Sequence, residues 1–372
     1  MRQRESSQSR PRIERLWERK LALRDLPAWL ALAALAGLYR GGMRARLLFW
    51  RMRKQRAGVA TISVGNLTVG GNGKTPFTLF VANRLQSRGL SVGIASRGYD
   101  RARSKARAML VAEGGVLNVS PDEAGDEPAM MAKRFSGPIA VARRRIDAIE
   151  LLARRGPLDA VILDDAFQHI RLARDVDLVL VGSERGFGNG WMLPAGPLRE
   201  PVGAVRRADA VVLINFGNGP SAITPRQMKK LGTRTILHAA VRPSALVVAE
   251  QNVWREIPLS LVGRRVIAVS GLADPRSFYA MLRELDADLS GVLEYPDHHA
   301  YTPADWQAIR NAMRVGDIVV TTEKDLVKLE RFPFARDSLY ALRLEVTMTD
   351  ADARVLDEEI LKRIYDQPAR RA

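Results

Sequence analysis

The sequence predicts an α/β protein in which a parallel sheet is covered by helices and a smaller α/β domain follows. Apolar runs of four to six residues, rich in Val, Ile and Ala, alternate with segments of helical period along most of the chain. Such runs are typical of strands that are buried on both faces of a parallel sheet. The chain has 372 residues, 47% of them hydrophobic and 27% charged, which is enough for two domains with sizeable cores.

The expected elements follow this alternation. Strands are expected at residues 59–63, 91–96, 108–111, 138–142, 160–163, 178–181, 210–214, 265–270, 291–295 and 317–322. Helices are expected from Phe77 to Arg88, from about residue 128, and between the fourth of these strands and Arg155.

The composition changes near residue 215. Residues 215–224 are rich in Gly, Asn, Pro and Ser and are interpreted as a linker. Two apolar runs after it, 234–241 and 244–248, predict a β-hairpin. We therefore divide the chain into an N-terminal region, a first α/β domain and a smaller second one, at residues 1–57, 58–214 and 225–365.

A glycine-rich segment carries the most specific chemistry. Residues 64–75 read Val-Gly-Asn-Leu-Thr-Val-Gly-Gly-Asn-Gly-Lys-Thr and lie between an expected strand and an expected helix. In this order, backbone N–H groups and a helix N-terminus surround a phosphate, a lysine adds charge and Thr75 can bind Mg²⁺. The pattern G-x-x-x-x-G-K-[ST] has glycine where this chain has Thr68. The segment predicts a P-loop NTPase-like sheet and a nucleoside triphosphate bound by Thr68, Val69, Gly70, Gly71, Asn72, Gly73, Lys74 and Thr75.

Two groups of carboxylates are candidates for the same site. Asp164 and Asp165 follow an apolar strand, where a phosphate-loop enzyme holds Mg²⁺, although two aspartates there are also common in turns and helix caps. The segment 122–128 holds four acidic residues before a proline. By spacing alone it is best explained as a solvated helix start, and the alternative is a carboxylate that takes a proton from an attacking hydroxyl.

Three further motifs are rich in polar groups. Asp297-His298-His299 holds two of the four histidines, and it suits an acid/base pair or a metal site other than zinc. The proline-rich loop 193–201 could hold Arg199 as a phosphate clamp. The motif 322–325, Thr-Glu-Lys-Asp, superficially resembles a guanine-reading motif but lacks its asparagine and its spacing, so GTP is not predicted.

The composition limits the kinds of metal site and binding partner that the protein can have. There is no cysteine, which excludes disulfides and thiolate metal sites and fits a reducing compartment. The net charge of +17 requires an acidic partner, either nucleic acid, an anionic membrane or a phosphorylated substrate. Residues 1–60 contain fifteen Lys/Arg and four Asp/Glu, a net charge of +11.

The basic N-terminal region is also apolar in places. Residues 26–39 form an uncharged stretch of 14 residues, shorter than the roughly 20 that span a bilayer, and no signal-peptide cleavage site follows it. A second apolar cluster, 47–50, lies among arginines. Together they predict amphipathic helices in a membrane interface, with arginines on anionic lipid. The alternative is a helical hairpin packed on the protein's own core. Residues 1–12 are expected to be a disordered basic tail.

In combination, these motifs resemble the tetraacyldisaccharide 4'-kinases, the lipid A 4'-kinases of Gram-negative bacteria. Segments 64–76, 96–99, 125–128, 164–169, 193–201, 297–299 and 322–325 carry the resemblance in this order. Thr68 belongs to the family's version of the loop. Ala166 departs from the family, which usually has glycine there.

The resemblance implies the reaction: transfer of the ATP γ-phosphate to the 4'-hydroxyl of a tetraacyldisaccharide 1-phosphate, giving lipid IVA. It implies ATP and Mg²⁺ as cofactors, a lipid substrate, and a place at the inner membrane, peripheral or monotopic on the cytoplasmic face. The basic N-terminal region would then dock on the anionic membrane surface.

The resemblance also implies roles for single residues. Lys74 would bridge the β- and γ-phosphates, and Thr75, Asp164 and Asp165 would hold Mg²⁺. Asp126 would accept the hydroxyl proton, supported by His298, which replaces the helix-start interpretation of the acidic turn. Arg199 and Glu200 are expected at the nucleotide. The expected substrate residues are Arg97, Arg145, Gln168, His169 and Asp297.

Two other functions remain open from the residues alone. A membrane-docked P-loop ATPase acting as a switch would share the glycine-rich loop and the basic anchor. A nucleic-acid-binding ATPase would explain the charge, but the charge clusters with Trp29, Leu47, Phe49 and Trp50, which favours lipid, so no nucleic acid is expected. The sequence does not determine the oligomeric state.

Overall fold

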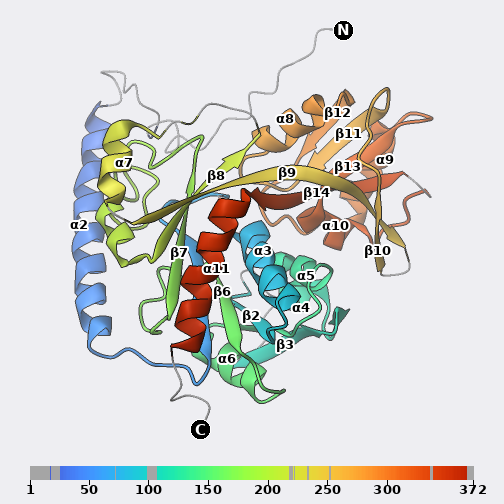
Figure 1. The fold of residues 1–372 in the computed structure, drawn as a ribbon. Coiled ribbons are helices and arrows are strands. Elements are labelled where there is room, and N and C mark those ends of the chain that lie inside the picture. The colour runs from blue at the N-terminus through green and yellow to red at the C-terminus, as the bar shows by residue number, and fades with distance from the viewer. Residues whose placement is uncertain are drawn as a thin grey trace.

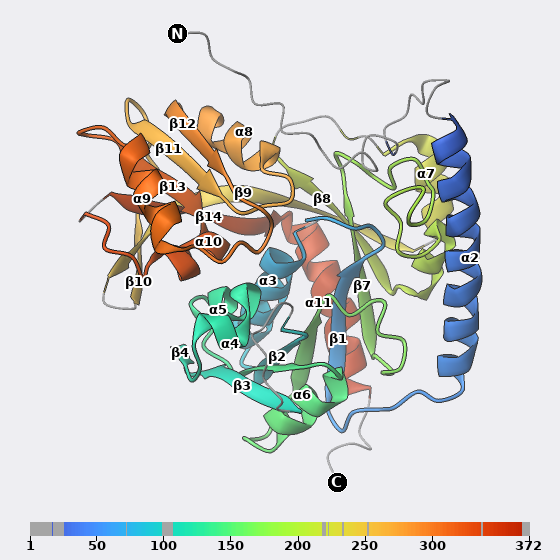
Figure 2. The same cartoon turned by 180° about the vertical axis from the view of Figure 1, so that it is seen from behind.

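The fold is a mixed α/β structure built on one large sheet (Figures 1 and 2). A computed structural model describes residues 17, 26–71, 73–98, 107–217, 221, 223–232, 234–250, 253–335 and 338–366. The strands are β1 (Ala60–Asn66), β2 (Val92–Ser96), β3 (Ala108–Glu113), β4 (Val116–Leu117), β5 (Ile139–Ala142), β6 (Ala160–Asp164), β7 (Val176–Gly182), β8 (Ala210–Phe216), β9 (Thr235–Glu250), β10 (Val253–Ile257), β11 (Arg265–Ser270), β12 (Asp288–Glu294), β13 (Ile318–Thr322) and β14 (Leu339–Met348). The helices are α2 (Leu26–Arg51), α3 (Lys74–Ser87), α4 (Pro121–Ala124), α5 (Asp126–Ala132), α6 (Arg145–Ala153), the 3-10 helix η2 (Val202–Arg207), α7 (Pro225–Leu231), α8 (Arg276–Glu284), α9 (Pro303–Ala312), α10 (Glu323–Leu329) and α11 (Asp350–Tyr365).

The strand order is β12-β11-β13-β14-β9-β8-β7-β1-β6-β2-β5-β3-β4, with β10 paired to β9. We call β1–β8 with α3–α6 the first half, and β10–β14 with α8–α10 the second half. From β5 to β9 in this order all neighbouring strands are parallel, as predicted, and β3 closes the edge antiparallel to β5. In the second half β12, β11, β13 and β14 are also parallel neighbours.

Both faces of the first half are covered. On one face, side chains of β1, β7 and β8 pack against α3, α5 and α11. On the other face, β6 and β5 pack against α6, whereas β7 and β8 pack against η2, α7 and Met43 of α2. The two-sided burial explains why these strands are continuous apolar runs.

The predicted hairpin at 234–248 is wrong, because a single strand, β9, occupies this segment. Its first part runs parallel to β8 and its second part antiparallel to β14. Pro243 lies inside it, opposite a register shift between Arg343 and Leu344 of β14. A bulge of this kind tolerates a residue that has no N–H to donate. The sheet is therefore continuous between the two halves, and β9 visibly crosses both (Figure 1).

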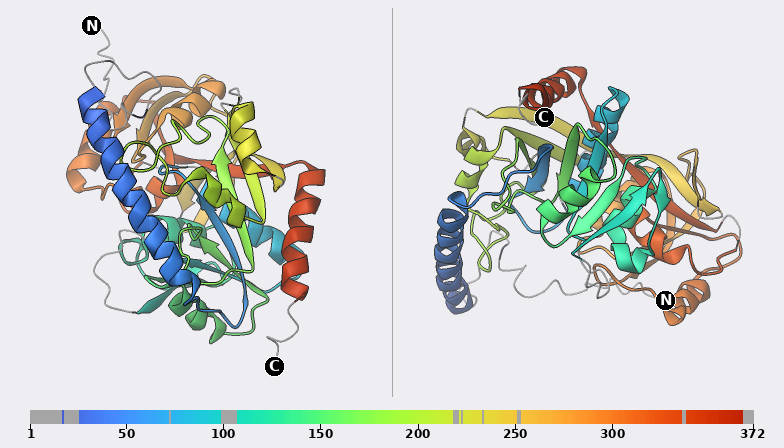
Figure 3. Two further views of the ribbon diagram at one scale, coloured as in Figure 1. Left: turned by 90° about the vertical axis from the view of Figure 1, so that its left-hand side faces the viewer. Right: turned by 90° about the horizontal axis from the view of Figure 1, so that it is seen from below.

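In the described part of the N-terminal region, one long helix, α2, spans both apolar clusters, where separate shorter helices or a helical hairpin were expected. In α2, Ala36 and Met43 are buried, Trp29 packs edge-on to Trp191 at 5.0 Å between ring centres, and the Tyr39 hydroxyl donates to the carbonyl of Arg199 (3.1 Å). The helix lies along the outside of the molecule (Figure 3). No helix in the described ranges is both long and apolar enough to cross a membrane. The expected tail, residues 1–12, lies outside the described residues.

Candidate active site

The glycine-rich segment joins the end of β1 to the start of α3. Gly70 and Gly73 have left-handed backbones (φ 98° and 66°), and α3 begins at Lys74 directly after Gly73. A Cβ on Gly65 would lie 2.6 Å from the Cβ of Phe167, so this position requires glycine. The structure thus has a glycine-rich turn followed directly by a helix N-terminus, and its binding of phosphate stays a prediction. Asn72 lies outside the described residues.

Asp164 and Asp165 lie beside this loop, at the end of β6. The hydroxyl of Thr78 in α3 donates to Asp164 (3.2 Å), and the ammonium of Lys74 lies 3.9 Å from Asp165. Burial, Glu127 and Asp165 raise the pKa of Asp164 to about 7. Burial also acts to raise the pKa of Asp165, but Lys74 and Arg199 outweigh it and hold that pKa below its usual value. Two neighbouring carboxylates therefore differ in how readily they ionise.

The donor set at this strand end fits a hard cation such as Mg²⁺. Carboxylate and hydroxyl oxygens are its preferred ligands, and it usually takes the remaining ones from phosphates and water. Asp164 is 2% exposed, and its burial, together with the neighbouring Glu127 and Asp165, opposes ionisation of its carboxyl group, which a bound cation would favour. Thr75 is half-buried in the first turn of α3. Within the described ranges, no group of three or more His, Asp or Glu side chains is arranged to hold a metal unaided.

The proline-rich loop 193–201 braces the glycine-rich loop. Its backbone accepts from the N–H of Val69 at Pro197 (2.9 Å), and the N–H of Arg199 donates to Leu67 (2.7 Å). The guanidinium of Arg199 donates to both oxygens of Asp165 (3.1 and 3.0 Å). Glu200, expected at the nucleotide, is instead fully buried, and its carboxylate accepts two hydrogen bonds from Arg207 (2.7 and 3.0 Å).

The expected substrate residues of the first half differ in their exposure and in their contacts. Arg145 is 3% exposed and donates to the carbonyl of Asp164 (2.8 Å), so it supports the strand end from behind. Arg97 is exposed after β2. Gln168 donates to the carbonyl of Asn66 (2.8 Å). Burial, followed by Arg145, Arg174, Arg46 and Arg171, lowers the pKa of His169 to about 4, so its imidazole is neutral within cationic surroundings.

Ala166 does not disturb this turn. Its side chain is fully buried against the core under α6, and its N–H donates to the carbonyl of Val64 (3.2 Å). The left-handed backbone in this segment belongs to Asp165 (φ 46°), and Ala166 has no positive φ. A methyl group at 166 is therefore compatible with the turn even though the family usually has glycine.

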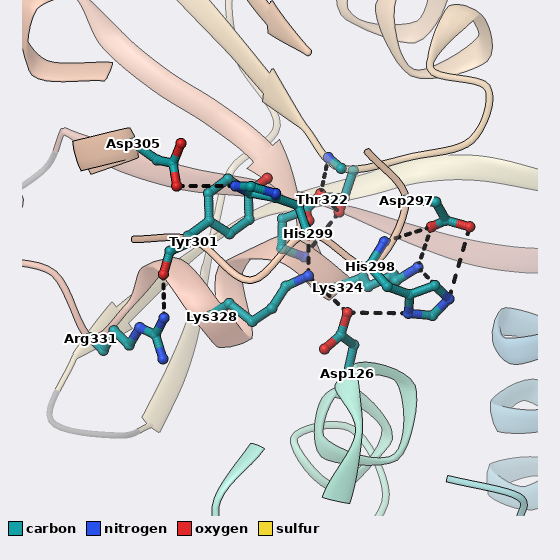
Figure 4. Close-up of polar contacts among 12 residues, drawn as sticks. Asp126, Asp297, His298, His299, Tyr301, Asp305, Thr322, Lys324, Lys328 and Arg331 are labelled. Atoms are coloured by element: carbon teal, nitrogen blue, oxygen red, sulfur yellow. Dashed lines mark hydrogen bonds and ion pairs between the residues drawn. The ribbon is translucent and has the colours of Figure 1, made fainter. Parts of the chain in front are cut away.

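Asp126 lies where the two halves of the sheet meet. It is the first residue of α5, and it faces side chains of the second half (Figure 4). Its Oδ2 lies 3.4 Å from Nδ1 of His298 and accepts from the ammonium of Lys328 at 2.8 Å. Burial alone would raise the pKa of Asp126, but the contacts with His298 and Lys328 outweigh it, so its pKa is lowered. Contact with Asp126 in turn raises the pKa of His298.

His298 is held from its other side as well. Its Nε2 lies 3.3 Å from the ammonium of Lys324, which also donates to Asp297 (2.7 Å). His298 has a left-handed backbone (φ 59°), a conformation that side-chain-bearing residues adopt rarely and mostly at functional positions. The second predicted histidine, His299, points away to Asp305 (3.0 Å; Figure 4).

Two features of the site were given no role by the sequence reasoning. Asn66 is fully buried, and neither polar atom of its amide has a hydrogen-bond partner among the described residues. Oε1 of Gln168 is likewise buried and has no hydrogen-bond partner among the described residues. Buried polar groups are nearly always paired, so these amides at the end of β1 fit a ligand with polar groups. The second feature is a pair of lysines: Lys324 contacts His298, and Lys328 contacts Asp126. Only the three-dimensional structure shows these contacts.

Comparison with known proteins identifies the family of this chain. A family model described as LpxK, tetraacyldisaccharide-1-P 4'-kinase, matches residues 28–365. A tetraacyldisaccharide 4'-kinase of Syntrophobacter fumaroxidans is 39% identical over 335 residues, which is 86% of this chain and 85% of the relative. One from an Anaeromyxobacter species is 38% identical over 346 residues, 90% of this chain and 92% of the relative.

A solved structure is similar over nearly the same range. The crystal structure of LpxK from Aquifex aeolicus in complex with ATP has a TM-score of 0.74 and 31% identity, and covers 91% of this chain and 100% of that one. Both the extent of the family match and the identity to full-length relatives exceed what a shared fold alone would give. The chain therefore belongs to the tetraacyldisaccharide-1-P 4'-kinase family.

Proposed function

We propose that this protein is an ATP-dependent kinase that phosphorylates the 4'-hydroxyl of a tetraacyldisaccharide 1-phosphate in lipid A biosynthesis. Membership of the family supports the activity. The observation that carries the mechanism is the pairing of two sites. Lys74 and Asp165 lie together in the first half, and Asp126 meets His298 across the halves.

The nucleotide end of the site belongs to the first half. The turn from Thr68 to Thr75 and the N-terminus of α3 bind the triphosphate, with Lys74 on the β- and γ-phosphates. Thr75, Asp164 and Asp165 would hold Mg²⁺, which would neutralise phosphate charge there. Arg199 fixes Asp165 through its two hydrogen bonds and aligns that carboxylate. Glu200 acts through Arg207, which holds the loop in place.

The acceptor end lies at Asp126. The 4'-oxygen forms the new bond to the γ-phosphorus, the bond from that phosphorus to the β,γ-bridging oxygen breaks, and ADP leaves with the electron pair. Asp126 takes the hydroxyl proton, and Nδ1–H of His298 stabilises the carboxylate in the required orientation. The contacts of Asp126 with His298 and Lys328 both engage Oδ2, which leaves Oδ1 for the substrate hydroxyl (Figure 4).

Cationic side chains suit a phosphorylated acceptor. The neutral imidazole of His169 is surrounded by arginines of the first half and by Arg46 of α2. Arg171 stacks on Trp50 near the end of α2, with 4.7 Å from the guanidinium carbon to the ring centre. With Arg97, Gln168 and Asp297, these groups bind the disaccharide and its phosphate between the phosphate loop and α2.

The outer face of α2 docks the enzyme on the membrane. Five of its large apolar side chains are at least half exposed: Leu30 (55%), Leu35 (52%), Leu38 (73%), Leu48 (66%) and Phe49 (50%). At 3.6 residues per turn all of these except Leu35 lie on the side opposite the buried Ala36 and Met43, and exposed arginines flank them at positions 40, 44, 46 and 51. This is the pattern of a helix lying in the plane of an anionic interface, here the cytoplasmic face of the inner membrane.

Labelled γ-phosphate tests the catalytic proposal. Wild-type protein should transfer it to a tetraacyldisaccharide 1-phosphate in detergent micelles, whereas Asp126→Asn should lose about 10³-fold in turnover and still bind ATP. Near-normal turnover of that variant would contradict the role of Asp126. Rapid ATP hydrolysis by the wild type with no transfer would instead favour the membrane-docked ATPase switch.

Liposome flotation tests the docking proposal. A double variant, Leu38→Glu with Leu48→Glu, should release the protein from anionic vesicles because both side chains would enter the interface. Val315→Glu is the matched control, since Val315 is fully exposed in the second half and far from α2 in sequence. Equal binding of all three proteins would refute docking through α2.

A further inference from the structure

Lys328 has a position in the site that no sequence motif indicates. It extends from α10 of the second half, and its side chain is only 4% exposed. Its ammonium lies 2.8 Å from Oδ2 of Asp126 and 3.6 Å from Oδ1 of Asp325, over the ring of Tyr301 at 5.4 Å from the ring centre. A lysine is rarely buried to this extent unless it is paired, so these three contacts define where its charge must lie.

The support behind Lys328 is rigid. Asp325 is fully buried and accepts from the backbone N–H of Gly271 (2.9 Å) and from the hydroxyl of Thr322 (2.7 Å). A Cβ on Gly271 would lie 2.8 Å from Oδ1 of Asp325, so the backbone approaches this carboxylate as closely as only glycine allows. Asp325 thus anchors the lysine, and the lysine in turn reaches Asp126 (Figure 4).

A second set of polar contacts connects the start of α10 to the segment directly after α5. The guanidinium of Arg134 donates to Glu323 (2.9 Å) and to the carbonyl of Leu344 (2.8 Å), and Arg343 donates to the other oxygen of Glu323 (2.8 Å). Asp126 and Lys328 therefore approach each other on a pair of helices that is fixed elsewhere. Their contact is not needed to bring the helices together.

We infer that Lys328 is a positioning residue for the proton acceptor. Together with His298 it contacts Oδ2 of Asp126, and this orients Oδ1 toward the substrate hydroxyl. The inference rests on the proposed role of Asp126. A carboxylate held at one oxygen by two donors has one remaining orientation for its other oxygen, which is how a base is kept within reach of its proton. The ammonium also favours the ionised carboxylate that can accept a proton.

The expected pH behaviour depends on the titratable groups around Asp126 in the described part of the chain. His298, Lys324, Lys328 and Tyr301 interact with Asp126 itself, whereas Glu127 and Asp297 act on His298, and Asp325 pairs with Lys328. Removing one cation at hydrogen-bond distance raises a carboxylate pKa by about 1 unit or more. Lys328→Met should therefore move the acid limb of the kcat profile to higher pH by about 1 unit.

Phosphate transfer at saturating Mg-ATP measures this. In Lys328→Met we expect kcat at pH 8 to fall about tenfold to a hundredfold, with the KM for ATP changed less than about threefold, because the contact is with the base and not with nucleotide. Lys328→Arg should keep the limb near its wild-type pH, because the charge is retained. Lys133→Met is the control, since Lys133 lies at the end of α5, 10% exposed, and pairs with Glu330 at 3.8 Å.

A double-mutant cycle decides between positioning and stability. In an Asp126→Asn background, Lys328→Met should cause no further loss of kcat, because the group it acts through is gone. An equal further loss in that background, an unmoved acid limb, or the same effects in Lys133→Met would overturn the inference. If Lys328→Met does not fold, as judged by circular dichroism, Lys328→Gln replaces it. Wild-type activity that survives Asp126→Asn would reject the proposed base, not only the role of Lys328.

Discussion

The aspartates at the two ends of the site lie in opposite electrostatic settings. Asp164 lies among other carboxylates, accepts one hydroxyl hydrogen bond and has its pKa raised to about 7. Asp126 lies against a histidine and a lysine, and its pKa is lowered. In the first setting burial and neighbouring carboxylates oppose ionisation, which a bound cation would favour, whereas the second supplies its own cations. Groups whose surroundings push their pKa values apart are suited to different tasks, which fits the proposed roles of Asp164 in holding a metal and of Asp126 in accepting a proton.

The two ends also differ in how they are built. The nucleotide end is assembled from consecutive strand ends of the first half, where the ends of β1 and β6 meet at one edge of the sheet. The acceptor end needs one residue from α5 and several from the second half. Variants at the first end should therefore change nucleotide or metal binding, and variants at the second should change transfer alone.

The largest effect is expected at Lys74. Lys74→Met should reduce phosphate transfer about 10³-fold and weaken ATP binding, because it removes the charge that stabilises the phosphates in the transition state. Transfer assays and equilibrium binding of ATP measure the two effects. Loss of transfer with unchanged ATP affinity would make Lys74 resemble Asp126 and would erase the contrast between the ends.

Asp164→Asn should raise the Mg²⁺ concentration for half-maximal activity by about tenfold to a hundredfold. The amide removes a ligand charge but keeps the size of the side chain and its acceptor for Thr78. A Mg²⁺ titration of transfer at fixed ATP gives the shift directly. Asp126→Asn is the comparison, since its reduced activity should keep the wild-type Mg²⁺ dependence.

A smaller loss, about tenfold in kcat/KM for ATP, is expected for Arg199→Gln. Two hydrogen bonds to Asp165 disappear, but Lys74 still neighbours that carboxylate. Arg276→Gln is the control, because that arginine is exposed and pairs with Asp274, away from the loop 193–201 in sequence. If the two variants behave alike, the loop 193–201 does not align the metal-binding carboxylate.

The smallest expected effect concerns stability and pH. The pKa of His298 is raised, so its ionic contact with Asp126 is fully present below about pH 6.5 and is lost as pH rises through the folded-state pKa. His298→Gln should lower the unfolding temperature by about 2 °C at pH 6, from about 1 kcal/mol, and by less at pH 9. Thermal unfolding at both values measures this, with the exposed His238→Gln as control. A pH-independent difference would show that the contact is not ionic.

Much of the first half could be predicted because its local signals and its topology agree. Buried apolar runs mark β1, β2 and β5–β8 within a few residues, and the glycine-rich turn locates the start of α3. Because parallel strands end at one edge, Asp164 was expected near Lys74, and the structure brings Asp165 within 3.9 Å of it. Their roles as nucleotide and metal ligands stay predictions.

The rest depends on contacts that no local pattern encodes. β14 and α11 were not anticipated, and β9 was divided at Pro243, since the register shift that tolerates this proline forms only against β14, about a hundred residues away in the sequence. By spacing alone the acidic turn was best explained as a helix start, and only the family resemblance singled out Asp126. Lys328 shares no motif with Asp126, and the 202 residues between them explain why sequence reasoning missed it.

The continuity of β9 has a mechanical consequence. The first half holds its beginning through β8, the second half holds its end through β14, and no loop interrupts the 16 residues between. Any change in the angle between the halves must therefore be absorbed by twist along one extended backbone. A strand held on both edges resists such twist as a stiff elastic element. It would return the halves to one resting angle after each reaction cycle, so that the enzyme would be reset without a hinge.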